Sequence, residues 1–159
     1  MNDSISNIER PIELPIERKH SGKGVPSAIL HHDNALTNRQ QELLAQLSEY
    51  DSKVTVPKDS VSMIDLSALT AKTGVEYAMF TKGQECLIIR GNEWRVNVSE
   101  EYAKELAEQG YRWSGHTHPG VDGNCLIASR GDKAILKQFN QSESVIYNSV
   151  GNFSRFERE

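Results

Sequence analysis

The change of hydrophobic periodicity near Gly74 is the feature that most restricts how this 159-residue chain can fold. Before it, apolar residues recur at helical spacing in residues 36–47 and 62–72, and Thr37 with Gln40 forms a predicted capping box. After it, two strand-type runs, residues 75–81 and 85–90, flank a short turn that contains glycine. The pattern therefore predicts two helices followed by a β-hairpin.

The second half of the chain alternates between strand-type and helix-type segments. Residues 94–98 alternate apolar and polar side chains, which predicts a third strand, and Ser99 can cap a helix that ends at Gly110. A further helix is predicted over residues 129–139, and further strands over 111–116, 144–147 and 153–156. This order indicates a single α/β or α+β domain built around a mixed sheet.

Composition excludes several classes of protein. Hydrophobic residues make up 37% and charged residues 25% of the chain, as in a globular protein with one core. The net charge of −4 predicts no general attraction to nucleic acid. No apolar run reaches the roughly 20 residues that cross a bilayer, and the N-terminus lacks a signal-peptide core, so no membrane association is expected. Cys86 and Cys125 are too few for a disulfide framework, which favours a reducing compartment and leaves one disulfide as the alternative.

The first 33 residues differ from the rest of the chain. They contain a basic patch at residues 18–20 and three of the five prolines, namely Pro11, Pro15 and Pro26. Proline is rare inside central strands because it lacks the N–H that a ladder requires. We interpret residues 1–33 as an extended leader or linker and residues 34–159 as the folded domain.

The segment His116-Thr117-His118-Pro119 is the most informative motif for function. Residues two apart on a strand face the same side, so the two imidazoles can converge on one metal ion. Zinc accepts histidine nitrogen at roughly 2.0–2.1 Å. A pair of neighbouring histidines is also common at solvent-exposed, metal-free positions, so the pair needs a further ligand to be meaningful.

The segment Ser129-Arg130-Gly131-Asp132 supplies a candidate third ligand. Serine followed three residues later by an acid is a helix N-cap pattern that requires no metal. The same cap would also hold the Asp132 carboxylate in the first helical turn. Three protein ligands and one open position are the composition of a catalytic zinc site, whereas a structural zinc fills all four positions.

Glu76 is the candidate general base. It begins an otherwise apolar predicted strand, where it is either an exposed strand-end carboxylate or a catalytic group. Zinc lowers the pKa of bound water from about 15.7 toward about 7, and a nearby carboxylate can take the proton and pass it to a leaving amine. Glu85 and Glu93 also lie at or near predicted strands and compete for this role.

Together these segments resemble the JAMM motif of the MPN (JAB domain) metalloprotease family: a glutamate on an early strand, then His-x-His-Pro, then Ser-x-x-Asp. The match spans residues 75–139. The resemblance implies zinc held by His116, His118 and Asp132, water activated by Glu76, and an oxyanion hydrogen-bonded by Ser129. It favours Glu76 over Glu85 and Glu93, because the motif requires a glutamate on the earliest strand. It also implies a curved mixed sheet flanked by helices, of the cytidine deaminase-like type, and hydrolysis of a peptide or isopeptide bond in a protein or peptide substrate.

The chain also departs from the family pattern. Its spacer between His118 and Ser129 is a few residues longer than the commonest form, and Asp122 or Cys125 in it could act as an alternative ligand. The helical region 36–72 and the approach to His116 look more like bacterial JAB domains appended to large secreted or phage-associated proteins, including polymorphic toxins.

Three functions therefore remain open from the sequence. The first is a zinc-dependent peptidase or isopeptidase. The second is a toxin effector that uses the same zinc chemistry, and the third is a non-catalytic MPN-type interaction scaffold. The expected location is cytoplasmic, or secreted as part of a larger effector protein.

Overall fold

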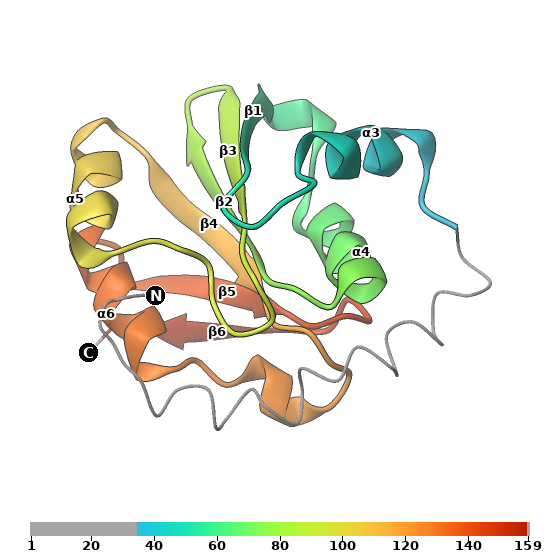
Figure 1. The fold of residues 1–159 in the computed structure, drawn as a ribbon. Helices are drawn as coiled ribbons and strands as arrows, with labels where there is room; N and C mark the ends of the chain where they lie inside the picture. Colours follow the sequence, from blue (N-terminus) through green and yellow to red (C-terminus); the bar gives the residue numbers. More distant parts are fainter. Residues whose placement is uncertain (1–34, 159) are drawn as a thin grey trace.

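The computed structural model describes residues 35–158, so the leader predicted over residues 1–33 lies outside the described residues. The described part contains four α-helices, two short 3-10 helices and six strands (Figure 1). The α-helices are α3 (Asn38–Gln46), α4 (Met63–Thr73), α5 (Glu100–Glu108) and α6 (Arg130–Gln138). The strands are β1 (Lys53–Pro57), β2 (Tyr77–Lys82), β3 (Glu85–Arg90), β4 (Arg112–Thr117), β5 (Glu143–Tyr147) and β6 (Phe153–Glu157). The 3-10 helices are η1 (Lys58–Ser60) and η2 (Gly123–Leu126).

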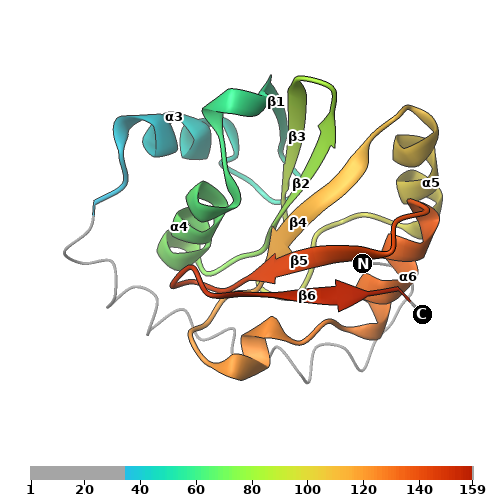
Figure 2. The ribbon, with the colours of Figure 1, turned by 180° about the vertical axis from the view of Figure 1, so that it is seen from behind.

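The strands form one mixed sheet in the order β1-β3-β2-β4-β5-β6. All neighbours are antiparallel except β4 and β5, which are parallel and are connected through η2 and α6. Figures 1 and 2 show α5 and α6 on one side of the sheet and α3 and α4 on the other. The predicted class, a single mixed α/β domain, is confirmed.

The two faces of the sheet carry separate apolar cores. On the α5 and α6 face, the core residues include Phe80, Trp113, Leu136 and Phe156. On the α3 and α4 face, they include Leu47, Leu66, Tyr77 and Ile88. Alternate residues of a strand point to opposite faces, so the apolar β2 and β3 serve both cores at once.

Strand β1 was not predicted from the sequence. Residues Lys53–Pro57 form an edge strand that pairs with β3 and ends at Pro57. An edge strand tolerates proline because one side of its backbone makes no ladder hydrogen bonds. The short Lys53–Pro57 run lacks the length that would have distinguished it from a loop.

The strand predicted over residues 94–98 is wrong. Val96 and Val98 are buried and Asn97 is exposed, so the alternation is real, but the segment joins no sheet. The Asn92 side chain accepts hydrogen bonds from the backbone of Trp94 and Arg95, which bends the chain locally. Strands β2 and β3 are also each paired on both sides, so neither offers an edge to this segment.

The other predicted elements are confirmed to within a few residues, including the capping box of Thr37 with Gln40 and the cap of α5 by Ser99. Gly74 ends α4 with a positive φ of 77°, a conformation that favours glycine. No helix in residues 35–158 is long and apolar enough to cross a membrane.

Candidate metal centre

Strand β4 brings its histidines to the α5 and α6 face through an irregularity in its pairing with β2. Met79 is opposite Gly115 and Phe80 is opposite Trp113, so Ser114 is an extra residue on β4. A β-bulge of this kind reverses the alternation of side chains beyond it. Trp113 and His116, three residues apart, consequently lie on the same face, with ring centroids 4.8 Å apart and nearly parallel planes.

His116 and His118 converge on the Asp132 carboxylate at the start of α6. The Nε2 atom of His116 lies 3.2 Å from Asp132 Oδ2, and that of His118 lies 3.4 Å from the same oxygen. Ligand atoms on a tetrahedron with bonds of about 2.0–2.1 Å lie about 3.3–3.4 Å apart. One ligand atom from each residue lies within 4.8 Å of the others, and all three side chains are buried. This donor set, in which both imidazoles lie at about that tetrahedral spacing from the carboxylate, could hold a metal ion.

The two histidines are oriented in different ways. His118 Nδ1 lies 2.9 Å from the backbone carbonyl oxygen of Cys125, a bond that requires a proton on Nδ1 and turns Nε2 toward the carboxylate. Within residues 35–158, His116 has no such hydrogen bond at Nδ1. Its ring is instead held by packing, between Trp113 on one side and the edge contact with Phe156.

Helix α6 holds Asp132 through its first turn. Ser129 Oγ accepts a hydrogen bond from the Asp132 backbone N–H, and the Ser129 backbone N–H donates to Asp132 Oδ2. Both residues are buried. Burial alone would raise the pKa of Asp132, but the charges and hydrogen bonds of His116 and His118 hold it well below its usual range. The carboxylate is thus ionised where the imidazoles meet it.

Glu76 lies directly before β2 and reaches the same site. Its Oε2 atom is 3.9 Å from His118 Nε2, and the residue is 2% exposed. The competing residues Glu85 and Glu93 are both exposed to solvent. The sequence argument that Glu76 occupies the earliest strand was wrong, because β1 precedes it, but the structure nevertheless places Glu76 beside the histidines.

Asp122 and Cys125 do not join the cluster of possible ligands formed by the described residues. Asp122 accepts hydrogen bonds from the Asn124 backbone and the Cys125 thiol at the start of η2. Cys125 instead meets His118 through its backbone carbonyl. The long spacer therefore folds into a short helix that supports a ligand, without contributing one.

A buried hydroxyl pair behind the histidines was not anticipated from the sequence. Thr117, between the two histidines, lies 2.5 Å from Thr70 of α4 through their Oγ1 atoms. Thr117 Oγ1 also accepts a hydrogen bond from the Tyr77 backbone N–H. These contacts join the end of β4 to α4 and to the start of β2, next to Glu76. No sequence motif predicts these contacts, since threonine is common in β-strands.

Comparison with protein-family models, with curated proteins and with solved structures finds no match to this chain.

Proposed function

We propose that this protein is a zinc-dependent hydrolase that cleaves a peptide or isopeptide bond in a protein or peptide substrate. The observation that carries the proposal is the buried meeting of two imidazole Nε2 atoms on one carboxylate oxygen, at 3.2 and 3.4 Å. A buried cluster of this composition, with a second carboxylate beside it, fits a catalytic zinc site better than a purely structural one, which would fill all four positions.

In this proposal His116, His118 and Asp132 hold the ion, which would polarise the scissile carbonyl and lower the pKa of an attacking water. Glu76 takes the proton from that water and returns it to the leaving amine nitrogen. The 3.9 Å separation of its carboxylate from His118 supports this role. Burial of Glu76 also keeps bulk water from competing for the carboxylate.

Ser129 would donate a hydrogen bond to the oxyanion that develops on the scissile carbonyl. Its Oγ already accepts from the Asp132 backbone N–H, which occupies one lone pair and leaves the hydroxyl proton free to donate. A donor fixed by a helix cap needs little reorganisation as the charge forms.

The finer fold assignment belongs to the same proposal. A glutamate before β2, His-x-His at the end of β4 and Ser-x-x-Asp at the start of α6 follow the order that the resemblance to the JAMM motif implies. We therefore propose a JAB/MPN-like domain, in which the helical region before β2 covers the sheet face opposite the site.

The test combines metal content with hydrolysis. The purified full chain should contain one zinc per molecule by plasma mass spectrometry, and should cleave a defined mixture of peptides and isopeptide-linked conjugates in a chelator-sensitive way. Glu76→Gln should keep the zinc and lower turnover by about 10²–10⁴-fold, because the proton acceptor is lost.

Glu85→Gln and Glu93→Gln are the matched controls, since both remove a carboxylate that is exposed to solvent. They should cleave the same peptides at the parent rate. A folded protein without stoichiometric zinc would contradict the proposal and favour the interaction scaffold. Full activity in Glu76→Gln would remove Glu76 from the mechanism.

A further inference from the structure

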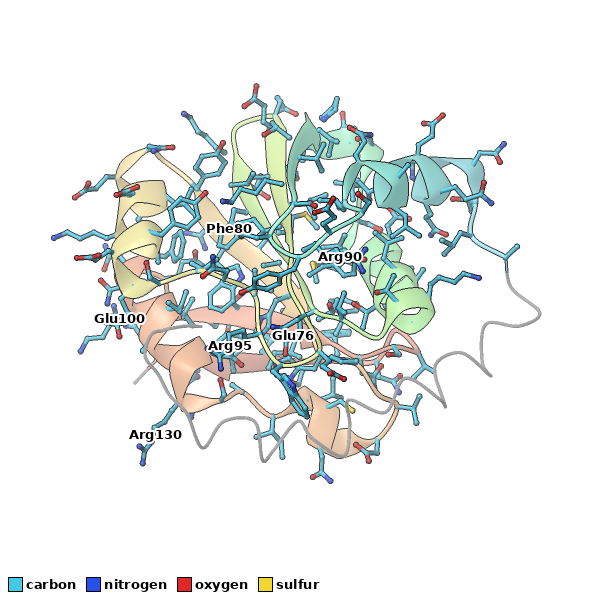
Figure 3. The ribbon with its side chains drawn as sticks, in the orientation of Figure 1. Glu76, Phe80, Arg90, Arg95, Glu100 and Arg130 are labelled. Atoms are coloured by element: carbon cyan, nitrogen blue, oxygen red, sulfur yellow. The ribbon has the colours of Figure 1, made fainter. Side chains whose placement is uncertain are left out.

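A small cavity adjoins the metal ligands on the α5 and α6 face. Its volume is about 20 Å³, enough for roughly one water molecule. His116 and Asp132 are among its lining residues, and Phe80, Val96 and Trp113 supply apolar walls. Arg95 completes the lining and is the only lysine or arginine among the described residues that border the cavity. Figure 3 shows Arg95 and Glu76 as neighbours around this region.

Among residues 35–158, no carboxylate forms a salt bridge with the Arg95 side chain. Arg39 and Arg155, by contrast, each form one. One of the lining residues also has an unused donor: the buried Trp113 Nε1 has no hydrogen-bond partner in the described part of the chain. Buried donors in native structures usually have partners, so this cavity is suited to a group that accepts hydrogen bonds.

The backbone around Arg95 is held firmly. The Glu76 N–H donates to the Asn92 carbonyl, and the Gly91 N–H donates to the Glu76 carbonyl. The Asn92 N–H donates to the Arg95 carbonyl, closing a tight loop. A Cβ at Gly91 would lie 2.1 Å from the Arg95 carbonyl oxygen, so only glycine permits this close approach. One loop thus fixes Glu76 and Arg95 together.

We propose that Arg95 is a specificity-determining residue, whose guanidinium pairs with a carboxylate that the substrate carries next to the scissile amide. This inference rests on the proposed hydrolase function and adds the class of substrate. Arginine presents a planar fork of donors that matches a carboxylate in two parallel hydrogen bonds. The small cavity suits a compact group and has no room for a large side chain.

Two substrates carry the required carboxylate. One is a chain whose last residue is released, with its α-carboxylate on Arg95. The other is an internal bond followed by an aspartate, with the side-chain carboxylate on Arg95. Both place one negative charge a few atoms beyond the amide that is cleaved.

The test measures binding as well as cleavage. Zinc-loaded full-length protein carrying Glu76→Gln, which keeps the probes intact, is titrated by calorimetry with three peptides. They are acetyl-Ala-Ala-Ala with a free C-terminus, the same peptide as its C-terminal amide, and acetyl-Ala-Ala-Asp amide. At least one carboxylate peptide should bind about tenfold tighter than the Ala-Ala-Ala amide, as a charge-assisted hydrogen bond permits. The one that does so identifies the source of the carboxylate.

Adding Arg95→Gln to the Glu76→Gln protein should abolish the preference for the carboxylate peptide. The backbone bonds of residue 95 do not use its side chain, so the loop should remain intact, and thermal denaturation checks this. Adding Arg95→Lys instead, which keeps the positive charge but loses the planar pair of guanidinium donors, should leave a reduced preference. Adding Arg130→Gln is the matched control and should preserve the preference. Arg130 is exposed, is not among the residues that line the cavity, and points away from Glu76 and Arg95 in Figure 3.

Equal binding of all three peptides would overturn the inference. A carboxylate preference that survives Arg95→Gln would also overturn it, because the charge would then be held elsewhere. Failure of the hydrolase proposal has a different signature. In that case the zinc-loaded parent protein would cleave none of the peptides, while an Arg95-dependent preference for carboxylates would still be measured.

Discussion

Two helices on opposite faces of the sheet begin with the same four-residue pattern. Ser62 to Asp65 starts α4, and Ser129 to Asp132 starts α6. In each, the serine side chain accepts from the backbone N–H of the aspartate, and the carboxylate accepts from the serine N–H. Both carboxylates are buried. As local structure the two capping boxes are equivalent.

The two capping boxes differ in the side chains from other elements that contact the aspartate carboxylate. Asp65 receives hydrogen bonds from Arg39 and Gln40 of α3, which fully engage its second oxygen. Asp132 meets His116 and His118. One motif therefore closes a structural contact between helices, while the other creates a candidate metal site. A capping pattern by itself carries no functional meaning, and its partners from distant segments assign the role.

The largest expected difference follows from replacing each aspartate by asparagine. Asp132→Asn should weaken zinc binding by at least about 100-fold, because loss of even an outer partner of a ligand costs about 10–100-fold. Asp65→Asn should leave zinc affinity unchanged. Competition with a chromophoric chelator measures both. If both variants lost zinc affinity to the same extent, the assignment of metal binding to Asp132 and not to Asp65 would be wrong.

Replacing the N-cap serine of each capping box by alanine should affect turnover differently in the two cases. Ser129→Ala should lower turnover by about 100-fold or more, as removal of an oxyanion donor does. Ser62→Ala should leave turnover unchanged. Each should cost about 1 kcal/mol of unfolding free energy through the lost cap, so stability serves as the internal control. Equal turnover in both variants would show that Ser129 acts only as a cap.

Asp65→Asn should act on stability instead. We expect a loss of about 1–3 kcal/mol in urea denaturation, because Gln40 and Arg39 lose their charged acceptor. The Arg39 side chain is 57% exposed, so solvent screening reduces its share of the effect. Gln46→Ala, on an exposed position of the same helix α3, is the control and should change stability far less. An Asp65→Asn variant as stable as the parent would show that this contact is incidental.

The smallest expected effect is the pH dependence of the stability that Asp65→Asn loses. Burial alone would raise the pKa of Asp65, but hydrogen bonds from Gln40, Arg39 and the Ser62 backbone, with the Arg39 charge, lower it below its usual 3.8. A carboxyl whose folded pKa is depressed stabilises the fold above its unfolded pKa, and this contribution is lost as the pH falls through the folded pKa.

The stability difference between parent and Asp65→Asn should consequently be constant from pH 7 to about 5 and shrink below about 4. Urea denaturation at a series of pH values measures it. A difference that grew on acidification would reverse the sign and refute the assignment.

Much of the secondary structure could be predicted because its causes are local. Three helices begin with a serine N-cap that depends only on the next few residues, so the local sequence predicts where they start. The caps are Ser62 for α4, Ser99 for α5 and Ser129 for α6. The hairpin of β2 and β3 follows from alternating side chains and a short turn. The segment at residues 94–98 was misassigned because its alternation reflects packing against a core, while pairing depends on a free strand edge elsewhere.

For the candidate site, the sequence by itself determined the residue types and their local presentation: two histidines at the end of a strand and an aspartate fixed in a first helical turn. Only the tertiary structure decided that Asp132, rather than the identically capped Asp65, meets the imidazoles. It also decided that a bulge turns Trp113 onto His116, and that a loop brings Arg95 beside Glu76. Capping and alternation are set by residues within one or two turns. The meeting of distant side chains depends instead on strand order and on which face each helix covers, and no short stretch of sequence encodes these.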